Sequence, residues 1–365
     1  MWISKLNVQN CRIIAHAELE LSPTMNCFVG DNASGKSSLL EALSILARGR
    51  SFRTPRIQEV IHKGASNLTV SAKLSTITGH YYPIGISKST QQTQIRINHT
   101  DVKQQAELSS HLPLTIIHPN SVELLTGSPQ LRRAFIDWIA FYTIPEFNTA
   151  WRYYQRALKQ RNVCLRDPKQ RFALEQWTTQ LIQWIPTLQQ YRLQAVDNLK
   201  RELQNVIELF TCTGYPQLQL STGYPQDVAV DNLESLQQFI HSKREAELQQ
   251  GFTLYGAHRV DLHITLDNVS AVRIASRGQL KLLAVGLLLA RAKAVQPSHS
   301  LTPYGLLAID DLASELDEQN QQALYNTLHT TRQQLIMTST RHDAISTEFM
   351  DARVFHVKRG QITLA

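Results

Sequence analysis

Gly30-Asp31-Asn32-Ala33-Ser34-Gly35-Lys36-Ser37 fits the pattern G-x-x-x-x-G-K-[ST] of a phosphate-binding P-loop. The apolar residues 25–29 before it predict a buried strand, and the leucines of 37–47 recur at helical spacing. A strand, a glycine-rich loop and a helix are the context that the motif needs. Backbone N–H groups of the loop and the positive end of the helix can then surround a triphosphate. Lys36 would reach the β- and γ-phosphates, and the Ser37 hydroxyl would ligate Mg²⁺. The predicted nucleotide-binding residues are Gly30, Asp31, Asn32, Ala33, Ser34, Gly35, Lys36, Ser37 and Ser38.

A pair of acids follows a second apolar run much later in the chain. Residues 305–309 predict a buried strand that delivers Asp310 to its carboxyl end. P-loop NTPases hold Mg²⁺ with such an aspartate. Asp311 would then orient or deprotonate the attacking water, whereas the plainer alternative is a strand that ends in a capped turn. Ser314-Glu315-Leu316-Asp317 comes next, and a strand at 335–340 ends in hydroxyls that can bond a γ-phosphate or a water.

Ser276-Arg277-Gly278-Gln279 opens a helix that is apolar on more than one side, which predicts burial. A serine and a glycine at a helix N-terminus can bind an anion, or Ser276 can simply cap the helix. A long, mostly helical insertion separates this segment from the P-loop. We therefore expect Ser276, Gly278 and Gln279 of one subunit to contact the γ-phosphate held by another, so that ATP bridges two subunits.

The bulk composition limits the class of protein. The chain has 365 residues, of which 42% are hydrophobic, with a net charge of +7 and a pI near 9.2. This length holds two or three domains, and the charge favours an anionic partner, which can be nucleotide, nucleic acid or acidic lipid. No apolar run is long enough to span a membrane, and no signal peptide is apparent. Four widely spaced cysteines indicate reduced thiols in a cytoplasmic protein, and the histidines lack metal-ligand spacing.

Residues 146–210 and 233–248 are predicted to be mostly helical, and the return to the nucleotide domain is placed near residue 252. No heptad pattern is long enough for an extended coiled coil. One part of this region is basic and is either a solvated face or a DNA-binding one: Arg152, Arg156, Lys159, Arg161, Arg166, Lys169 and Arg171. The arginines of residues 48–53, directly after the P-loop helix, are interpreted equally as a helix C-terminal charge cap or as a nucleotide contact.

Together these motifs resemble the RecF family of bacterial recombination and gap-repair ATPases, relatives of the SMC and ABC-type ATPases. The resemblance runs nearly end to end. Two motifs depart from the family pattern: Ala33 stands where the P-loop usually has glycine, and the Gly256–Asp261 motif has Ala257 where a proline and Val260 where an acid is usual. If position 33 needs a positive φ, Ala33 strains the loop. Besides the P-loop and its Leu40-Glu41-Ala42 helix, the motifs are Arg50-Ser51-Phe52-Arg53, Arg132-Arg133-x-Phe135-Ile136-Asp137, Gly256-Ala257-His258-Arg259-Val260-Asp261-Leu262, Ser276-x-Gly278-Gln279, and Asp310-Asp311 with Ser314-Glu315-Leu316-Asp317.

The resemblance implies an α/β fold, namely the ABC-type ATPase head of a P-loop NTPase, with a mixed sheet and flanking helices. It also implies an inserted, mostly helical lobe and no long coiled coil. Lobe I would comprise residues 1–118 and 252–365, and lobe II residues 119–251. The cofactors would be ATP and Mg²⁺, with Asp311 and Lys36 as catalytic residues and with Ser37 and Asp310 as metal ligands.

The function implied is that of a weak, DNA-dependent ATPase. ATP would drive a homodimer that clamps duplex, gapped or single-stranded DNA, and slow hydrolysis would reset it. RecR and RecO would be partners in loading RecA at single-strand gaps, which supports replication restart and the SOS response. The expected DNA contacts are Arg132, Arg133, Arg152, Arg156 and Lys159. Two rival interpretations are a small-molecule kinase and a DNA-binding scaffold with a vestigial ATP site; the intact Lys36, Ser37, Asp310 and Asp311 argue against the scaffold.

Overall fold

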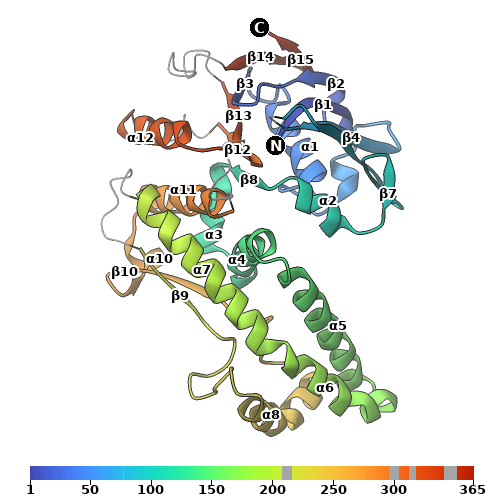
Figure 1. The fold of residues 1–365 in the computed structure, drawn as a ribbon, viewed down its shortest axis with the longest axis vertical. Helices are drawn as coiled ribbons and strands as arrows, with labels where there is room; N and C mark the ends of the chain where they lie inside the picture. The colour runs from blue at the N-terminus through green and yellow to red at the C-terminus, as the bar shows by residue number, and fades with distance from the viewer. Residues whose placement is uncertain (77, 208–215, 296–303, 312–317, 341–351) are drawn as a thin grey trace. The chain divides into compact units, whose positions relative to one another are not determined.

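The computed structural model describes residues 1–76, 78–207, 216–295, 304–311, 318–340 and 352–365. The chain divides into two compact units. The first comprises Met1–Ser121 and Val295–Ala365, and the second comprises Val122–Ala294. Figure 1 shows the helices and strands of both units and labels them where there is room.

The first unit contains two six-stranded sheets. The mixed sheet has the order β15 (Gln361–Leu364), β14 (Arg353–Lys358), β3 (Met25–Val29), β13 (Gln334–Ser339), β12 (Leu306–Asp310) and β8 (Leu114–Ile117). Its strands run parallel except for β15, which is antiparallel to β14. The antiparallel sheet has the order β2 (Ile14–Glu20), β1 (Trp2–Cys11), β4 (Asn67–Ser75), β5 (Tyr81–Ser89), β6 (Thr93–Ile97) and β7 (Thr100–Val102).

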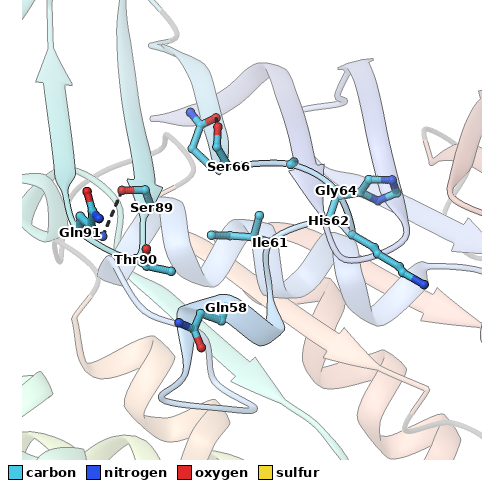
Figure 2. Close-up of a pocket in the computed structure, with 11 residues that line it drawn as sticks. Gln58, Ile61, His62, Gly64, Ser66, Ser89, Thr90 and Gln91 are labelled. Carbon is cyan, nitrogen blue, oxygen red and sulfur yellow. Dashed lines mark hydrogen bonds between the residues drawn. The ribbon is translucent and has the colours of Figure 1, made fainter.

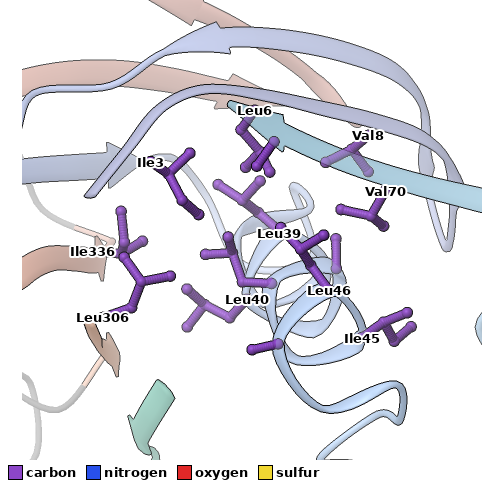
Figure 3. Close-up of a cluster of buried hydrophobic side chains, with 14 of the residues drawn as sticks. Ile3, Leu6, Val8, Leu39, Leu40, Ile45, Leu46, Val70, Leu306 and Ile336 are labelled. Carbon is purple, nitrogen blue, oxygen red and sulfur yellow. The ribbon is translucent and has the colours of Figure 1, made fainter. Parts of the chain in front are cut away.

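Helix α1 (Lys36–Arg48) packs against strands of both sheets. Its Leu39 and Leu46 belong to one buried cluster with side chains of the antiparallel sheet and of the parallel strands, and Figure 3 shows these side chains meeting around the helix. Strand β4 alternates half-buried and buried residues, the period-2 pattern of a strand with one face on the core. Strand β3 is buried throughout, as expected for a central parallel strand. The shorter elements of this unit are η1 (Ile57–Glu59), α2 (Gln105–His111) and α12 (Glu318–His329); η2 (Pro119–Val122) lies at the division between the units.

The second unit is mostly helical. Helix α7 (Ile185–Ile207) packs against α4 (Pro129–Thr143), α5 (Phe147–Arg166), α6 (Leu174–Gln183) and α11 (Arg277–Ala294). A three-stranded antiparallel sheet has the order β11 (Val269–Ser270), β10 (Leu262–Leu266) and β9 (Pro216–Leu220). The helices are α3 (Glu123–Thr126), α4 (Pro129–Thr143), α5 (Phe147–Arg166), η3 (Pro168–Ala173), α6 (Leu174–Gln183), α7 (Ile185–Ile207), α8 (Leu233–Ser242), α9 (Arg244–Gln250), α10 (Ala271–Ile274) and α11 (Arg277–Ala294).

The boundary between the units differs from the one expected at residue 251. Residues 252–294 belong to the helical unit, because β10 pairs with β9 and because α11 packs along α7. The strand β9 also lies between the two stretches predicted to be helical, residues 146–210 and 233–248, where the sequence analysis places no strand. Both differences arise from pairing between segments that are far apart in the chain, which local periodicity does not encode.

Candidate functional site

The P-loop connects β3 to α1, as the motif requires. Gly30 donates its N–H to Ser339 O at 3.2 Å, and a Cβ at Gly30 would lie 2.1 Å from Val357 O of β14. Gly35 has φ 119°, a conformation that favours glycine. Both glycines are therefore required by the backbone itself.

Ala33 has φ 60°, so the strain anticipated at this departure from the family pattern is present. A left-handed conformation costs a non-glycine residue about 1–2 kcal/mol. A residue near the other end of the sequence stabilises the loop, because Gly360 donates its N–H to Ser34 O at 2.7 Å. Gly360 and Arg359 form the two-residue turn between β14 and β15, and both have positive φ. The P-loop thus rests on the C-terminal hairpin.

Lys36 is buried at the start of α1. Its ammonium group donates hydrogen bonds to Gly30 O and, at 2.9 Å, to Asp31 O. Burial lowers the pKa of Lys36 from its ordinary value, and the carboxylates of Asp311, Asp310 and Asp31 act in the opposite direction. These carboxylates favour the charged form that a phosphate would recognise.

Ser37 and Asp310 lie together although 273 positions separate them. Ser37 Oγ donates to Asp310 Oδ1 at 3.1 Å, and Thr338 Oγ1 donates to the same oxygen at 2.8 Å. The topology explains this meeting, because parallel strands β3, β13 and β12 are adjacent and end at the same edge of the sheet. A serine hydroxyl and a carboxylate are oxygen ligands of the kind that Mg²⁺ prefers, so these residues fit the metal.

Asp311 follows at the end of β12 with φ 47°. Its N–H donates to Thr338 Oγ1 at 3.1 Å. The residue therefore stands beside Asp310 and within the electrostatic reach of Lys36. The neighbouring motif Ser314-Glu315-Leu316-Asp317 lies outside the described residues.

The arginine-rich segment after α1 is partly structural. Gly49 ends the helix with φ 63°, and Arg48 Nη2 donates to Leu114 O at 2.5 Å. Ser51 donates to Glu41, a fully buried acid that also forms two hydrogen bonds with Arg12, at 2.8 and 3.0 Å. Glu41 thereby connects α1 to the turn between β1 and β2 and to the segment that follows the helix.

An open groove of about 660 Å³ lies in the first unit (Figure 2). Its walls come from two stretches, residues 58–67 and 89–91, and are largely polar. One wall residue, His62, hydrogen-bonds through Nδ1 to Arg12 O at 2.6 Å. The residue after Arg12, Ile13, lies in the turn between β1 and β2 and against Gly35 and Gly360, so the groove and the P-loop share this turn. The sequence carried no signal that indicated this groove.

In the second unit, Ser276 caps helix α11. Its Oγ accepts from Gln279 N at 3.3 Å, and its N–H donates to Gln279 Oε1 at 2.8 Å. This reciprocal pair is a capping box, so the capping interpretation is correct. Ser276 and Gly278 are also exposed, and within the described part of the chain a Cβ at Gly278 would meet only Ser276 Oγ, at 4.0 Å. The helix N-terminus is therefore open to a further group.

Arg132 and Arg133, which are also expected to contact DNA, form hydrogen bonds within the second unit. Arg132 forms two hydrogen bonds with the carboxylate of Asp261, at 2.8 and 2.9 Å, and a third with Gly127 O at 2.8 Å. Arg133 donates to Val260 O at 2.8 Å. Position 260 contributes its carbonyl, so the replacement of an acid by valine leaves this contact in place. The partners at positions 260 and 261 lie more than 120 positions away, where spacing along a helix cannot reveal them, and DNA contact by either arginine stays a prediction.

A second set of contacts joins the two family motifs to which these residues belong, Arg132-Arg133-x-Phe135-Ile136-Asp137 and Gly256–Asp261. Arg192, 1% exposed, donates two hydrogen bonds to Asp137 and one to Ala257 O. His258 Nδ1 lies 2.8 Å from Tyr154 Oη, and burial lowers the pKa of His258 to about 4, so this histidine is neutral near pH 7. The Arg132–Asp137 motif and the Gly256–Asp261 motif therefore form one internal polar network.

The remaining basic candidates do lie on the surface. Arg152, Arg156 and Lys159 are exposed on α5, at the spacing of one helical face. Arg161, from the same basic run, is buried and paired with Glu247 at 2.6 Å. Among the described residues, no helix is both long and apolar enough to cross a bilayer.

The two-sheet head, its P-loop and the acid at the end of β12 define a P-loop ATPase head of the SMC/RecF ABC type. A sequence model described as "RecF/RecN/SMC N terminal domain" matches residues 2–363. The chain belongs to the RecF family. It is 34% identical over 367 residues to the DNA replication and repair protein RecF of Shewanella oneidensis, covering 100% of this chain and 99% of that protein. The protein of the same name from Vibrio vulnificus is 33% identical, with 99% of each covered.

Solved structures agree on the fold. The structure titled "recombination mediator protein RecF-ATP in RecFOR pathway" superposes with a TM-score of 0.86 at 21% identity, covering 100% of this chain and 97% of that one. An Smc head bound to the C-winged helix domain of ScpA gives a TM-score of 0.59 at 15% identity, covering 100% and 97%. The predicted family and head fold are thereby confirmed.

Proposed function

We propose that this chain is an ATP-dependent DNA-binding protein of recombinational gap repair. The observation that carries the proposal is the convergence of the P-loop, Ser37 and Asp310 at one edge of the mixed sheet. Full-length similarity to DNA replication and repair proteins supports the biological setting, and a relative solved with ATP supports the choice of nucleotide.

In the proposed mechanism, the loop amides and Lys36 bind the triphosphate. Ser37 and Asp310 hold Mg²⁺, which would neutralise charge on the phosphates when bound. Asp311 orients the attacking water and accepts its proton. Because an aspartate reaches less far than the glutamate common in ABC enzymes, we expect slow turnover.

The proposed active form is a dimer in which the exposed Ser276 and Gly278 of one subunit contact the γ-phosphate held by the other. The open N-terminus of α11 supports this role, since its N–H groups attract anions. Dimerisation would clamp DNA, and hydrolysis would release it. We further propose that the protein acts in the cytoplasm with RecR and RecO to help load RecA at gaps, in support of replication restart and SOS induction.

One experiment tests the function as a whole. The ATPase rate and the oligomeric state are measured with and without gapped duplex DNA. The proposal expects ATP-dependent dimers and a low rate that DNA raises. A rate that responds to a small metabolite and is indifferent to DNA would identify a kinase instead.

Replacement of Ser276 with arginine is expected to leave ATP binding by the monomer intact and to block ATP-dependent dimerisation, because a long cation then occupies the contact with the partner. Binding is measured with a fluorescent nucleotide and dimerisation by sedimentation. The matched control is Asn232→Arg, which removes the N-cap of α8 and adds the same charge elsewhere in this unit. An equal loss of ATP binding and dimerisation in Ser276→Arg would refute the contact across the subunits.

The triple variant Arg152→Gln, Arg156→Gln and Lys159→Gln is expected to weaken duplex binding. Each phosphate contact that is lost should reduce the slope of log affinity against log salt by about 1, because fewer counterions are released. The control triple removes the same charge from Lys200, Arg201 and Arg244 of the same unit. Equal effects of the two triples would show that only net charge matters, and an unchanged slope would remove α5 from the DNA interface.

A further inference from the structure

The hydroxyl of Thr338 lies between the two acids of the proposed site. Thr338 is the residue of β13 that pairs directly with Asp310 of β12, and it is 3% exposed. On its other side, β13 pairs with β3, whose last residues lead into the P-loop. The side chain of Thr338 therefore comes from the strand that separates the two halves of the site.

Both hydrogen-bonding functions of this hydroxyl are used. Thr338 Oγ1 donates to Asp310 Oδ1 at 2.8 Å and accepts the N–H of Asp311 at 3.1 Å. A hydroxyl has one proton to donate, so the two directions are unambiguous: a carboxylate accepts and an amide donates. One buried oxygen thus contacts both acids.

The contact to Asp310 orients its carboxylate. From the described residues, two hydrogen bonds reach Asp310, those of Ser37 and Thr338, and both end on Oδ1. Rotation of the carboxylate would break both bonds, so the group is held with Oδ1 toward the hydroxyls. Such outer contacts commonly set the position and affinity of a metal ligand.

The contact to Asp311 acts on the backbone. Asp311 has φ 47°, a left-handed conformation that a non-glycine residue adopts only at a cost in free energy. The bond from its N–H to Thr338 helps to hold the chain in that conformation. The direction in which the Asp311 side chain leaves the strand depends on this backbone angle.

We propose that Thr338 is a positioning residue, whose one hydroxyl fixes the position of both the metal-binding acid, Asp310, and the water-orienting acid, Asp311. This inference rests on the proposed function, because it assigns Asp310 to the metal and Asp311 to the water. Thr338 itself need not touch nucleotide or metal. Its loss should affect steps that depend on Mg²⁺ and spare the contacts made by the P-loop alone.

The test compares Thr338→Val, which keeps the shape and removes the hydroxyl, with Thr338→Ser, which keeps the hydroxyl. For Thr338→Val we expect the Mg²⁺ concentration that half-saturates ATPγS binding to rise about 10-fold or more, and kcat to fall by about 10–100-fold. Affinity for ATPγS without Mg²⁺ should change less than about 2-fold, because Lys36 and the loop are untouched. Thr338→Ser should restore the Mg²⁺ dependence to near the wild-type value.

The matched control is Thr115→Val in β8 of the same sheet. Thr115 is fully buried, and its hydroxyl has no hydrogen-bond partner among the described residues. This variant makes the same chemical change at a place where the hydroxyl does nothing, so its Mg²⁺ dependence and kcat should match the wild type. Thermal unfolding of all three variants separates a loss of structure from a loss of positioning.

A Thr338→Val protein with the wild-type Mg²⁺ dependence would overturn the inference. An impairment of Thr338→Ser equal to that of Thr338→Val would also overturn it, because shape would then matter and the hydroxyl would not. A different result marks failure of the proposed function: wild-type protein that binds ATPγS without any Mg²⁺ effect, or Asp310→Ala that behaves as wild type. In that case the proposed function is refuted, and the positioning role of Thr338 is refuted together with it.

Discussion

Replacement of Lys36 with alanine is expected to abolish ATP binding at working concentrations and, with it, ATP-dependent dimerisation. Lys36 is buried where the loop meets α1, and its ammonium group lies over the carbonyls of Gly30 and Asp31. In the bound state these contacts would be exchanged for phosphate oxygens. A charge-assisted hydrogen bond contributes about 1.5–3 kcal/mol, so the loss of contacts to two phosphates should weaken binding by roughly 100-fold or more.

The measurement is a titration with a fluorescent ATP analogue, followed by sedimentation with and without ATP. Lys5→Ala is the control, because Lys5 is an exposed lysine in the same unit, paired with Glu18 on the neighbouring strand. Thermal unfolding of the first unit should be similar in both variants. Affinity of Lys36→Ala within about 3-fold of the wild type, an effect of less than about 0.7 kcal/mol, would contradict the assigned role.

Replacement of Glu247 with glutamine is expected to destabilise the second unit by about 3–5 kcal/mol, because it leaves the buried charge of Arg161 without its counter-ion. Both residues are 1% exposed. Arg161 donates to Glu247 at 2.6 Å and also to Thr178 and Thr253, so the guanidinium group is held from three sides. The lost attraction is therefore not replaced by water.

Urea unfolding followed by tryptophan fluorescence measures this effect, because four of the five tryptophans (Trp138, Trp151, Trp177 and Trp184) lie in the second unit. The control is Glu175→Gln, which breaks an exposed pair with Arg244, and a loss below about 1 kcal/mol is expected there. The double variant Arg161→Met and Glu247→Met should be more stable than Glu247→Gln, since no unpaired charge stays buried. A Glu247→Gln variant no less stable than Glu175→Gln would show that the pair is unimportant.

The site was predictable in part because its pieces carry local signals. The P-loop pattern and the apolar run before Asp310 each follow from spacing and residue type over a short stretch. The resemblance then supplied the relation between them. Even the strain at Ala33 was foreseeable, since a glycine is replaced at a position where the loop needs a positive φ.

Other features were not predictable, and each depends on a partner distant in sequence. Arg132 is basic and close to a helix N-terminus, and nothing near it in the sequence indicates that it pairs with Asp261. Gly360 supports the P-loop from the opposite end of the chain. Thr338 was one of several hydroxyls at a strand end, and only the strand order made it the one that joins Asp310 and Asp311.

By itself, then, the amino-acid sequence determined the chemistry: a phosphate-binding loop, an acid pair at the end of a buried strand and a basic helix face, because these depend on residue type and short-range periodicity. The tertiary structure alone decided which arginines are internal, where the helical unit ends and which hydroxyl meets both acids. The physical reason is that strand order and buried ion pairs are set by packing between segments that lie well apart in the chain, from 28 positions for Asp310 and Thr338 to 129 for Arg132 and Asp261, and no local pattern records which segment will be the neighbour.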